Sequence, residues 1–317
     1  AALLAYESST LIGVQPAGRA PILNPVMEMA IGPGDRLIFI AADDDTIRLS
    51  GRTDIAIQAT AMQLAPPEAA KPERILILGW NWRAPTIVNQ LDQYVPAGSL
   101  AMVVSDDPGI AAALADHCAN VRNLEVVART GDITDRRLLD ALNVPSYQYV
   151  ILLCYSERLD TQQADAQTLI TLLHLRDIGS TQGDAFTIVS EMLDSRNRTL
   201  AEITQADDFI VSDRLISLML AQVAENKALN AVFADLFDPE GAEVYLRPVS
   251  RYVTPGTPLD FYTVVEAAKQ RGEIAIGYRL ARFGDDKTRS YGVHVNPNKA
   301  EAITFAAEDK IIVIAEE

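Results

Sequence analysis

The sequence predicts an α/β fold in which a doubly wound parallel sheet is joined to small β-rich α+β subdomains. Three observations predict it. Between residues 74 and 212, short apolar runs alternate with segments of helical periodicity, as in a parallel sheet with helices on both faces. Gly79 directly follows the first apolar run, where such folds place a tight turn before a helix. Both ends of the chain are rich in short strand-like runs.

Six apolar runs in the central region have the length of buried strands. They cover residues 74–78, 100–105, 125–128, 149–154, 186–190 and 209–211. The segments between them suit helices, over residues 85–94, 109–118, 136–142, 160–176 and 197–205. Six strands with intervening helices match the two-halved Rossmann-like fold.

The two ends of the chain share one order of elements: a glycine-containing strand, an Asn-Pro pair, an Asp-containing turn and an apolar strand. In the first copy these are residues 11–14, Asn24-Pro25, Asp35 and 36–41, and in the second 274–278, Asn296-Pro297, Asp309 and 310–315. We interpret the two stretches as a diverged internal repeat. Chance is the alternative, because strand–turn–strand patterns are common.

The segment 213–235 has no proline or glycine, and its apolar residues fall at helical spacing. It predicts a long helix whose apolar stripe packs either on its own domain or on a partner subunit. The Pro/Ala-rich stretch before residue 74 has the composition of a linker. The expected division is therefore 1–63 (β-rich), 64–73 (linker), 74–212 (Rossmann-like), 213–240 (crossover helices) and 241–317 (β-rich).

The composition excludes several classes of protein. The 317 residues carry 27 Lys+Arg and 43 Asp+Glu, a formal net charge of −16, which argues against nucleic acid as a partner and is compatible with cations. Two cysteines in separate segments suggest no disulfide framework and fit a reducing compartment. The chain begins without Met or a leader pattern, so we interpret it as a piece of a longer polypeptide whose membrane segment could lie upstream.

The turn after the first strand departs from the dinucleotide-binding pattern, which has glycines at its first, third and sixth positions. Here these positions hold Gly79, Asn81 and Ala84. Alanine is tolerated at the sixth position. Asn81 is the serious departure, because a side chain there obstructs close approach of a phosphate to the backbone.

The neighbours of this turn modify the prediction further. Trp80 and Trp82 add bulk. The free amides at the start of the following helix can still attract an anion, and Arg83 could assist. The turn is therefore a specific indicator of a Rossmann-like fold but only a weak indicator of NAD binding.

Four further candidates follow the later strands, on the carboxyl edge where open α/β sheets bind ligands. Asp106 could bind a ribose hydroxyl or cap the next helix. Asp132, beside Gly131, could approach a base or a cation. Tyr155 follows the fourth strand, and Glu191 follows the fifth.

Catalytic patterns are missing from the sequence. Its three histidines have no metal-ligand spacing, and it contains no nucleophile elbow and no Walker A loop. We therefore expect no enzyme. The acidic runs at 43–45, 207–208 and 285–286 could bind calcium through oxygen ligands, although a solvated turn is the commoner explanation.

The order of parts resembles the RCK (TrkA-type) regulators of potassium conductance. The resemblance is strongest over 131–139, 150–153 and 165–175, a Gly-Asp-x-Thr turn, a Leu-rich helix, an apolar strand and a long helix. The motifs Ile77-Leu78-Gly79-Trp80-Asn81 and Ile188-Val189-Ser190-Glu191 look like the CASTOR/POLLUX branch of ion channels and its bacterial relatives. In many RCK domains arginine stands at the position of Glu191.

The resemblance implies a function and an assembly. Residues 1–63 would be the C-terminal subdomain of one RCK unit, and 74–317 a complete second unit. The chain would be a cytosolic, ligand-sensing gating module of an ion channel or potassium transporter. The helix at 213–235 would form dimers that build a gating ring below a pore-forming segment of the same polypeptide. Calcium or a nucleotide (NAD, ATP or ADP) is the implied ligand, and the metal ligands are not assigned. An NAD(P)-dependent oxidoreductase and a ligand-free Rossmann interaction module are the alternatives.

Overall fold

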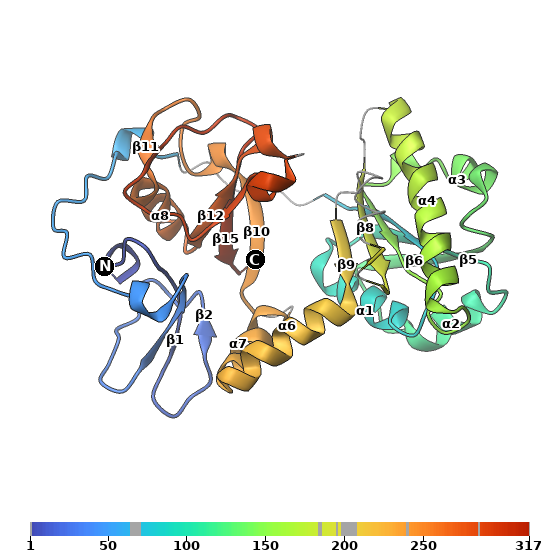
Figure 1. Ribbon diagram of the computed structural model, residues 1–317, viewed down its shortest axis with the longest axis horizontal. Coiled ribbons are helices and arrows are strands. Elements are labelled where there is room, and N and C mark those ends of the chain that lie inside the picture. The colour runs from blue at the N-terminus through green and yellow to red at the C-terminus, as the bar shows by residue number, and fades with distance from the viewer. Residues whose placement is uncertain are drawn as a thin grey trace. The chain divides into compact units, whose positions relative to one another are not determined.

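The computed structural model describes residues 2–63, 71–182, 186–194, 196–197, 208–238, 241–284 and 286–316. The chain divides into two compact units, one of residues 1–68 with 226–317, and one of residues 69–225. Both are drawn in Figure 1. The expected helix at 197–205 and the acidic pairs at 207–208 and 285–286 fall wholly or partly outside the described residues.

The 69–225 unit contains a six-stranded parallel sheet in the order β6-β5-β4-β7-β8-β9 (Figure 1). Its strands are β4 (Arg74–Leu78), β5 (Ser99–Ser105), β6 (Leu124–Thr130), β7 (Tyr149–Leu152), β8 (Thr187–Met192) and β9 (Asp208–Val211). All five pairings are parallel. In chain order this is 3-2-1-4-5-6, so the predicted doubly wound fold is confirmed, and the order reverses between β4 and β7.

Helices cover both faces of this sheet, because successive residues of a strand point to opposite sides. The helices are α1 (Ala84–Tyr94), α2 (Ile110–His117), α3 (Arg136–Leu142) and α4 (Thr161–Gln182). On β4, Leu76 and Leu78 join the core that contains Leu139 of α3 and Leu172 of α4. The residues between them, Ile75 and Ile77, join the core beneath α1 and α2.

The other unit has a four-stranded antiparallel sheet, β10-β15-β12-β13, a three-stranded sheet, β2-β1-β3, and a two-stranded sheet, β11-β14. The strands are β1 (Thr10–Gln15), β2 (Ile22–Leu23), β3 (Arg36–Ile40), β10 (Glu243–Pro248), β11 (Leu259–Asp260), β12 (Ile274–Arg279), β13 (Val293–Val295), β14 (Ala302–Ile303) and β15 (Lys310–Ala315). Its α-helices are α7 (Leu229–Leu236) and α8 (Phe261–Lys269). Asp260 caps α8 by accepting from Thr263 N.

The predicted internal repeat is confirmed at the level of strand register. Gly13 of β1 pairs with Ile38 of β3, and Gly277 of β12 pairs with Ile312 of β15, each just after an irregularity in the ladder. A Cβ on Gly13 would lie 2.6 Å from Ile22 O, and one on Gly277 would lie 2.2 Å from His294 O. Both positions therefore require glycine, because a neighbouring strand's carbonyl oxygen lies too close for any side chain.

The turns repeat as well. Asn24 and Asn296 both adopt positive φ, 44° and 52°. Their backbone N–H groups donate to Ile12 O and Ile276 O at 3.0 and 2.7 Å. Asp35 accepts from Ala17 N and Gly32 N, as Asp309 accepts from Ala281 N and Ala306 N. The counterparts lie 264 positions later for Ile12 and Ala17, 272 for Asn24, and 274 for Gly32 and Asp35, because the second copy has longer connections between its strands.

The two copies bond to each other reciprocally. Asn24 Nδ2 donates to Gly272 O at 2.9 Å, and Asn296 Nδ2 donates to Ser8 O at 3.0 Å, where Ser8 and Gly272 are themselves equivalent positions. Their apolar faces share one core that contains both Ile12 and Ile276. This reciprocity is that of a local pseudo-twofold contact, and it explains why residues 1–63 fold with the C-terminal region.

The predicted single helix over 213–235 is wrong. The structure has two helices, α6 (Ser212–Glu225) and α7 (Leu229–Leu236). Asn226 Oδ1 accepts from Ala228 N at 3.1 Å, and a side chain that bonds its own backbone in this way competes with a continuing helix. The break coincides with the boundary between the two units.

Lys299 ties the N-terminal segment to the C-terminal one, and we expect it to make stability depend on pH. It is 1% exposed, and Nζ donates to Tyr6 O and Ser9 O at 2.8 and 2.6 Å. Burial lowers its pKa from 10.5 to about 8, so the unfolded chain binds the proton more tightly. The free energy of unfolding of this unit should then rise as the pH goes from 8 to 10.5, by about 3 kcal/mol.

Urea unfolding followed by far-ultraviolet circular dichroism across this pH range checks the expectation, with Lys299→Met as the comparison. Buried tyrosines such as Tyr252, whose pKa burial raises, ionise only on unfolding and do so equally in both proteins, so the difference between the two proteins isolates Lys299. Equal pH slopes for the two proteins would contradict the assignment.

Candidate functional site

The glycine turn lies at the carboxyl end of β4, beside the point where the strand order reverses. Gly79 has φ +92°, and its amide donates to Val104 O at 2.8 Å. A Cβ at this position would lie 2.2 Å from Leu153 O. Position 79 therefore requires glycine because the backbone just after β7 lies against it. This requirement does not depend on phosphate binding.

Gly79→Ala should destabilise the 69–225 unit by about 3 kcal/mol or more, because it adds a backbone clash to the strain of a positive φ. Gly98→Ala is the matched control. Gly98 has φ +89°, and the nearest atom to its added Cβ is 3.7 Å away, so it carries the strain without the clash. Both tryptophans of the chain, Trp80 and Trp82, lie in this unit. Urea unfolding followed by tryptophan fluorescence therefore compares the variants, and equal losses would contradict the clash.

Asn81 fills the place that a glycine holds in the dinucleotide pattern. It is 1% exposed. Its Oδ1 accepts from Arg83 N at 3.0 Å, and its Nδ2 donates to Cys154 O and to Glu191 Oε2, both at 2.8 Å. The Asn81 side chain therefore links the turn after β4 to the ends of β7 and β8, on the other side of the strand-order reversal.

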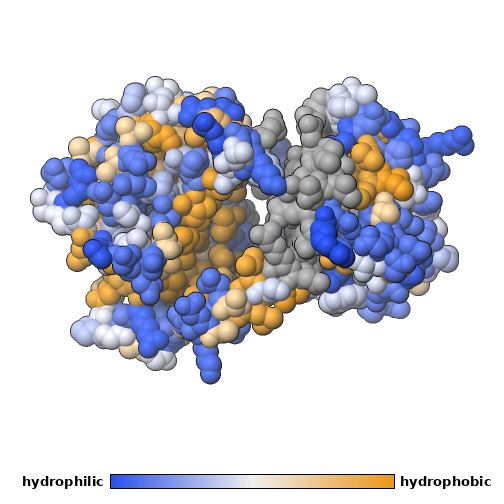
Figure 2. Space-filling view, viewed as in Figure 1, coloured by the Kyte–Doolittle hydropathy of each residue, from blue (hydrophilic) through white to orange (hydrophobic). Residues whose placement is uncertain are grey.

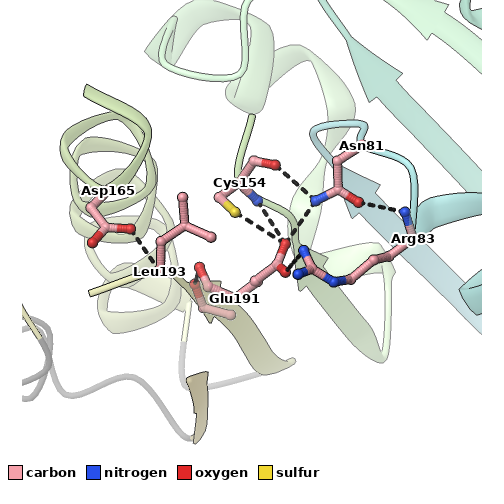
Figure 3. Close-up of polar contacts among 7 residues, drawn as sticks. Asn81, Arg83, Cys154, Asp165, Glu191 and Leu193 are labelled. Carbon is pink, nitrogen blue, oxygen red and sulfur yellow. Dashed lines mark hydrogen bonds and ion pairs between the residues drawn. The ribbon is translucent and has the colours of Figure 1, made fainter. Parts of the chain in front are cut away.

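Glu191 is the centre of this network (Figure 3). Its carboxylate is 7% exposed, and Arg83 Nη1 lies 2.6 Å from Oε1. Cys154 donates to Oε2 from its amide at 3.3 Å and from its thiol at 3.1 Å. Burial, then Glu191, raises the pKa of Cys154 far above its ordinary range, so this thiol stays protonated and is a poor nucleophile.

A second group surrounds Tyr155. Arg158 Nη2 lies 2.5 Å from Asp106 Oδ1, and its guanidinium stacks over the Tyr155 ring at 4.6 Å. Asp106 therefore does not cap α2. Asp107 does not cap it either, because the N-cap is Gly109 and no described side chain bonds the first turn; Asp107 orders the preceding turn by accepting from Gly109 N at 2.8 Å. Burial raises the pKa of Tyr155.

Asp132 stands apart from both groups. Its Oδ1 accepts from the amide and hydroxyl of Thr134, at 2.9 and 2.7 Å, which orders the turn before α3. Of the seven predicted site residues, Gly79, Asn81, Arg83 and Glu191 come together, Asp106 and Tyr155 form the neighbouring group, and Asp132 joins neither.

The seven predicted site residues leave out three contributors. Cys154 supplies an amide and a thiol to Glu191, and Arg158 neutralises Asp106. Asp165 of α4, 1% exposed, accepts from Leu193 N and Asp194 N at 2.9 and 3.0 Å and fixes the chain after β8 (Figure 3). The signal for Asp165 was a single acid at helical spacing from Thr168 and Leu172, which share the buried side of α4, and a buried acid needs hydrogen-bond partners.

Within the described ranges, no three His, Cys, Asp or Glu side chains gather closely enough to hold a metal ion. At 43–45, Asp43 accepts from Asp44 N at 2.7 Å and caps a short 3₁₀ helix, Asp44–Thr46. No described helix is long and apolar enough to cross a membrane.

No protein-family model matches the sequence. The chain is nevertheless similar along 99% of its length to plant ion channels. It is 30% identical to the probable ion channel CASTOR of Oryza sativa subsp. japonica, 28% to the probable ion channel POLLUX of Arabidopsis thaliana and 29% to the ion channel CASTOR of Lotus japonicus. It spans about two fifths of each, 38%, 41% and 40%.

Among solved structures, the human SLO3 gating ring matches 97% of this chain and 61% of its own, with a TM-score of 0.69 and 14% identity. At that identity the match shows that the two chains share a fold and nothing about the role of this one. The homologues of the chain are ion channels of the CASTOR and POLLUX type, and the resemblance seen in the sequence is confirmed.

Proposed function

We propose that this chain is a regulatory gating module of an ion channel, connected to a pore-forming segment of the same polypeptide and lying on the cytosolic face of the membrane. The observation that carries the proposal is its similarity to channels over 99% of its length. Residues 1–63 would be the C-terminal subdomain of a first RCK unit, and 74–317 would be a second unit. The reciprocal contact between the two repeats supports this division.

The helix α6 supports assembly of the module into a ring. Leu215, Ile216, Leu218 and Leu220 are exposed by 49%, 53%, 56% and 65%, and Figure 2 shows apolar side chains gathered over this helix. Four large apolar side chains exposed within six residues of one helix are uncommon on a monomer. We therefore infer that α6 pairs with α6 of a second copy.

The network around Glu191 indicates how a ligand would act. The ligand crevice of such sheets lies at the strand-order reversal, and here Asn81, Arg83 and Glu191 already bridge it. A nucleotide phosphate would have to displace the Glu191 carboxylate from Arg83, whereas a cation would approach Glu191 itself. Either ligand could gate only through different affinities for two arrangements of the assembly.

An oxidoreductase is the second candidate, and the site disfavours it. Cys154 is held protonated. Within the 69–225 unit the histidines are His117 at the end of α2 and His174 within α4, and neither is bonded to the Glu191 network, while His294 lies on β13 of the other unit. Calorimetric titration with calcium, NAD, NADH, ATP and ADP tests both candidates. We expect binding of one of these ligands without chemical conversion. Steady turnover of a nicotinamide cofactor would overturn the regulatory proposal.

A further inference from the structure

Three arginines surround one buried carboxylate in the unit formed by residues 1–68 and 226–317. Glu273, at the start of β12, is 4% exposed. Arg247 Nη1 and Arg251 Nη2 each lie 3.0 Å from its Oε1, and Arg271 Nε lies 3.9 Å from the same atom. Tyr252 donates its hydroxyl to the other oxygen. We call these residues the arginine cluster.

The carboxylate of Glu273 compensates only one of the three positive charges. The C-terminus of α8, next to Arg271, adds about half a negative charge, and no other described carboxylate contacts the cluster. A surplus of positive charge on side chains that are only 9–19% exposed is unfavourable without an anion. It is also out of keeping with a chain whose formal net charge is −16.

The donors of the cluster are incompletely used. The Arg271 side chain is 9% exposed and donates no hydrogen bond to any described residue, although a guanidinium has five N–H groups. The Nε atoms of Arg251 and Arg271 are buried without a partner. Arg247 and Arg251 remain 15% and 19% exposed, so solvent reaches parts of these two side chains.

We propose that the arginine cluster is a binding site for a phosphate group, either the free ion or a phosphate monoester. Such a group carries between one and two negative charges at neutral pH, which matches the uncompensated charge. Its oxygens fit the paired N–H groups of guanidinium forks. The site belongs to a different unit from the Glu191 network, so it is independent of the proposed gating function.

Calorimetric titration of the whole chain with inorganic phosphate and with glycerol phosphate, at constant ionic strength, tests this site. Arg271→Gln and Arg251→Gln should each weaken binding about tenfold or more. Arg289→Gln is the matched control, because Arg289 is in the same unit, 57% exposed and paired with Asp286. It should bind as the unsubstituted chain does. Tighter binding of glycerol phosphate would identify a monoester as the ligand, and equal binding the phosphate group alone.

A second measurement guards against variants that do not fold. Phosphate should raise the midpoint of thermal unfolding of the unsubstituted chain above that in chloride of equal ionic strength. Arg271→Lys, which keeps the charge and loses the fork, should reduce that increase. The proposal is overturned if neither ligand binds, or if Arg271→Gln and Arg289→Gln bind phosphate equally.

Discussion

Glu191→Ala should lower the free energy of unfolding of the 69–225 unit by about 3 kcal/mol, because it leaves several buried donors without their acceptor. Asn81 Nδ2, the Cys154 amide and Arg83 Nη1 all donate to this carboxylate. Glu191→Gln should cost about 2 kcal/mol, since its amide places two new donors among groups that already donate.

Tryptophan fluorescence during urea unfolding measures this loss, because Trp80 and Trp82 report only on this unit. Glu157→Ala is the control, an exposed glutamate of the same unit whose removal should change stability by less than about 0.5 kcal/mol. A similarly small change for Glu191→Ala would show that the network contributes nothing.

The same substitution should also change ligand binding. Without the carboxylate, Arg83 and the start of α1 become available to an anion. We expect Glu191→Ala to bind ADP or NAD more tightly than the unsubstituted chain in calorimetric titration. Unchanged or weaker binding would mean that Glu191 does not obstruct the crevice.

Ile216→Glu should convert the assembled chain into monomers. Ile216 is 53% exposed on α6, and burying such a side chain contributes about 1.5–3 kcal/mol. In a twofold contact the substituted residue is present on both subunits. The dissociation constant should therefore rise about a hundredfold or more.

Ala221→Glu is the matched control on the same helix. It adds the same charge at an exposed position about 140° around the helix from Ile216. Sedimentation velocity should show monomers for Ile216→Glu and assemblies for Ala221→Glu. Equal sedimentation of the two variants would contradict pairing through the side of α6 that carries Ile216.

Much of the fold was predictable because burial on both faces leaves a clear pattern in the sequence. The strands β4, β5 and β7 are nearly continuous apolar runs, and the repeat was visible because Gly13 and Gly277 meet the same steric demand. The break after α6 was not predictable from apolar spacing, because the periodicity continues while Asn226 bonds its own backbone.

The candidate site was predictable only in part, for a physical reason. Parallel strands end at one edge, so Asn81 and Glu191 could be placed near each other from the strand order alone. Which donor meets which acceptor depends on side-chain distances across that edge. The pairing of Arg158 with Asp106, and of the Cys154 thiol with Glu191, left no signal in the spacing.

Ion flux through the full-length gene product, reconstituted in lipid vesicles, tests the central claim most directly. The account predicts that flux responds to a ligand that binds this chain, that Ala221→Glu keeps the response, and that Ile216→Glu abolishes it. A ligand response that survives unchanged in Ile216→Glu, or a full-length product without any ion flux, would contradict the account.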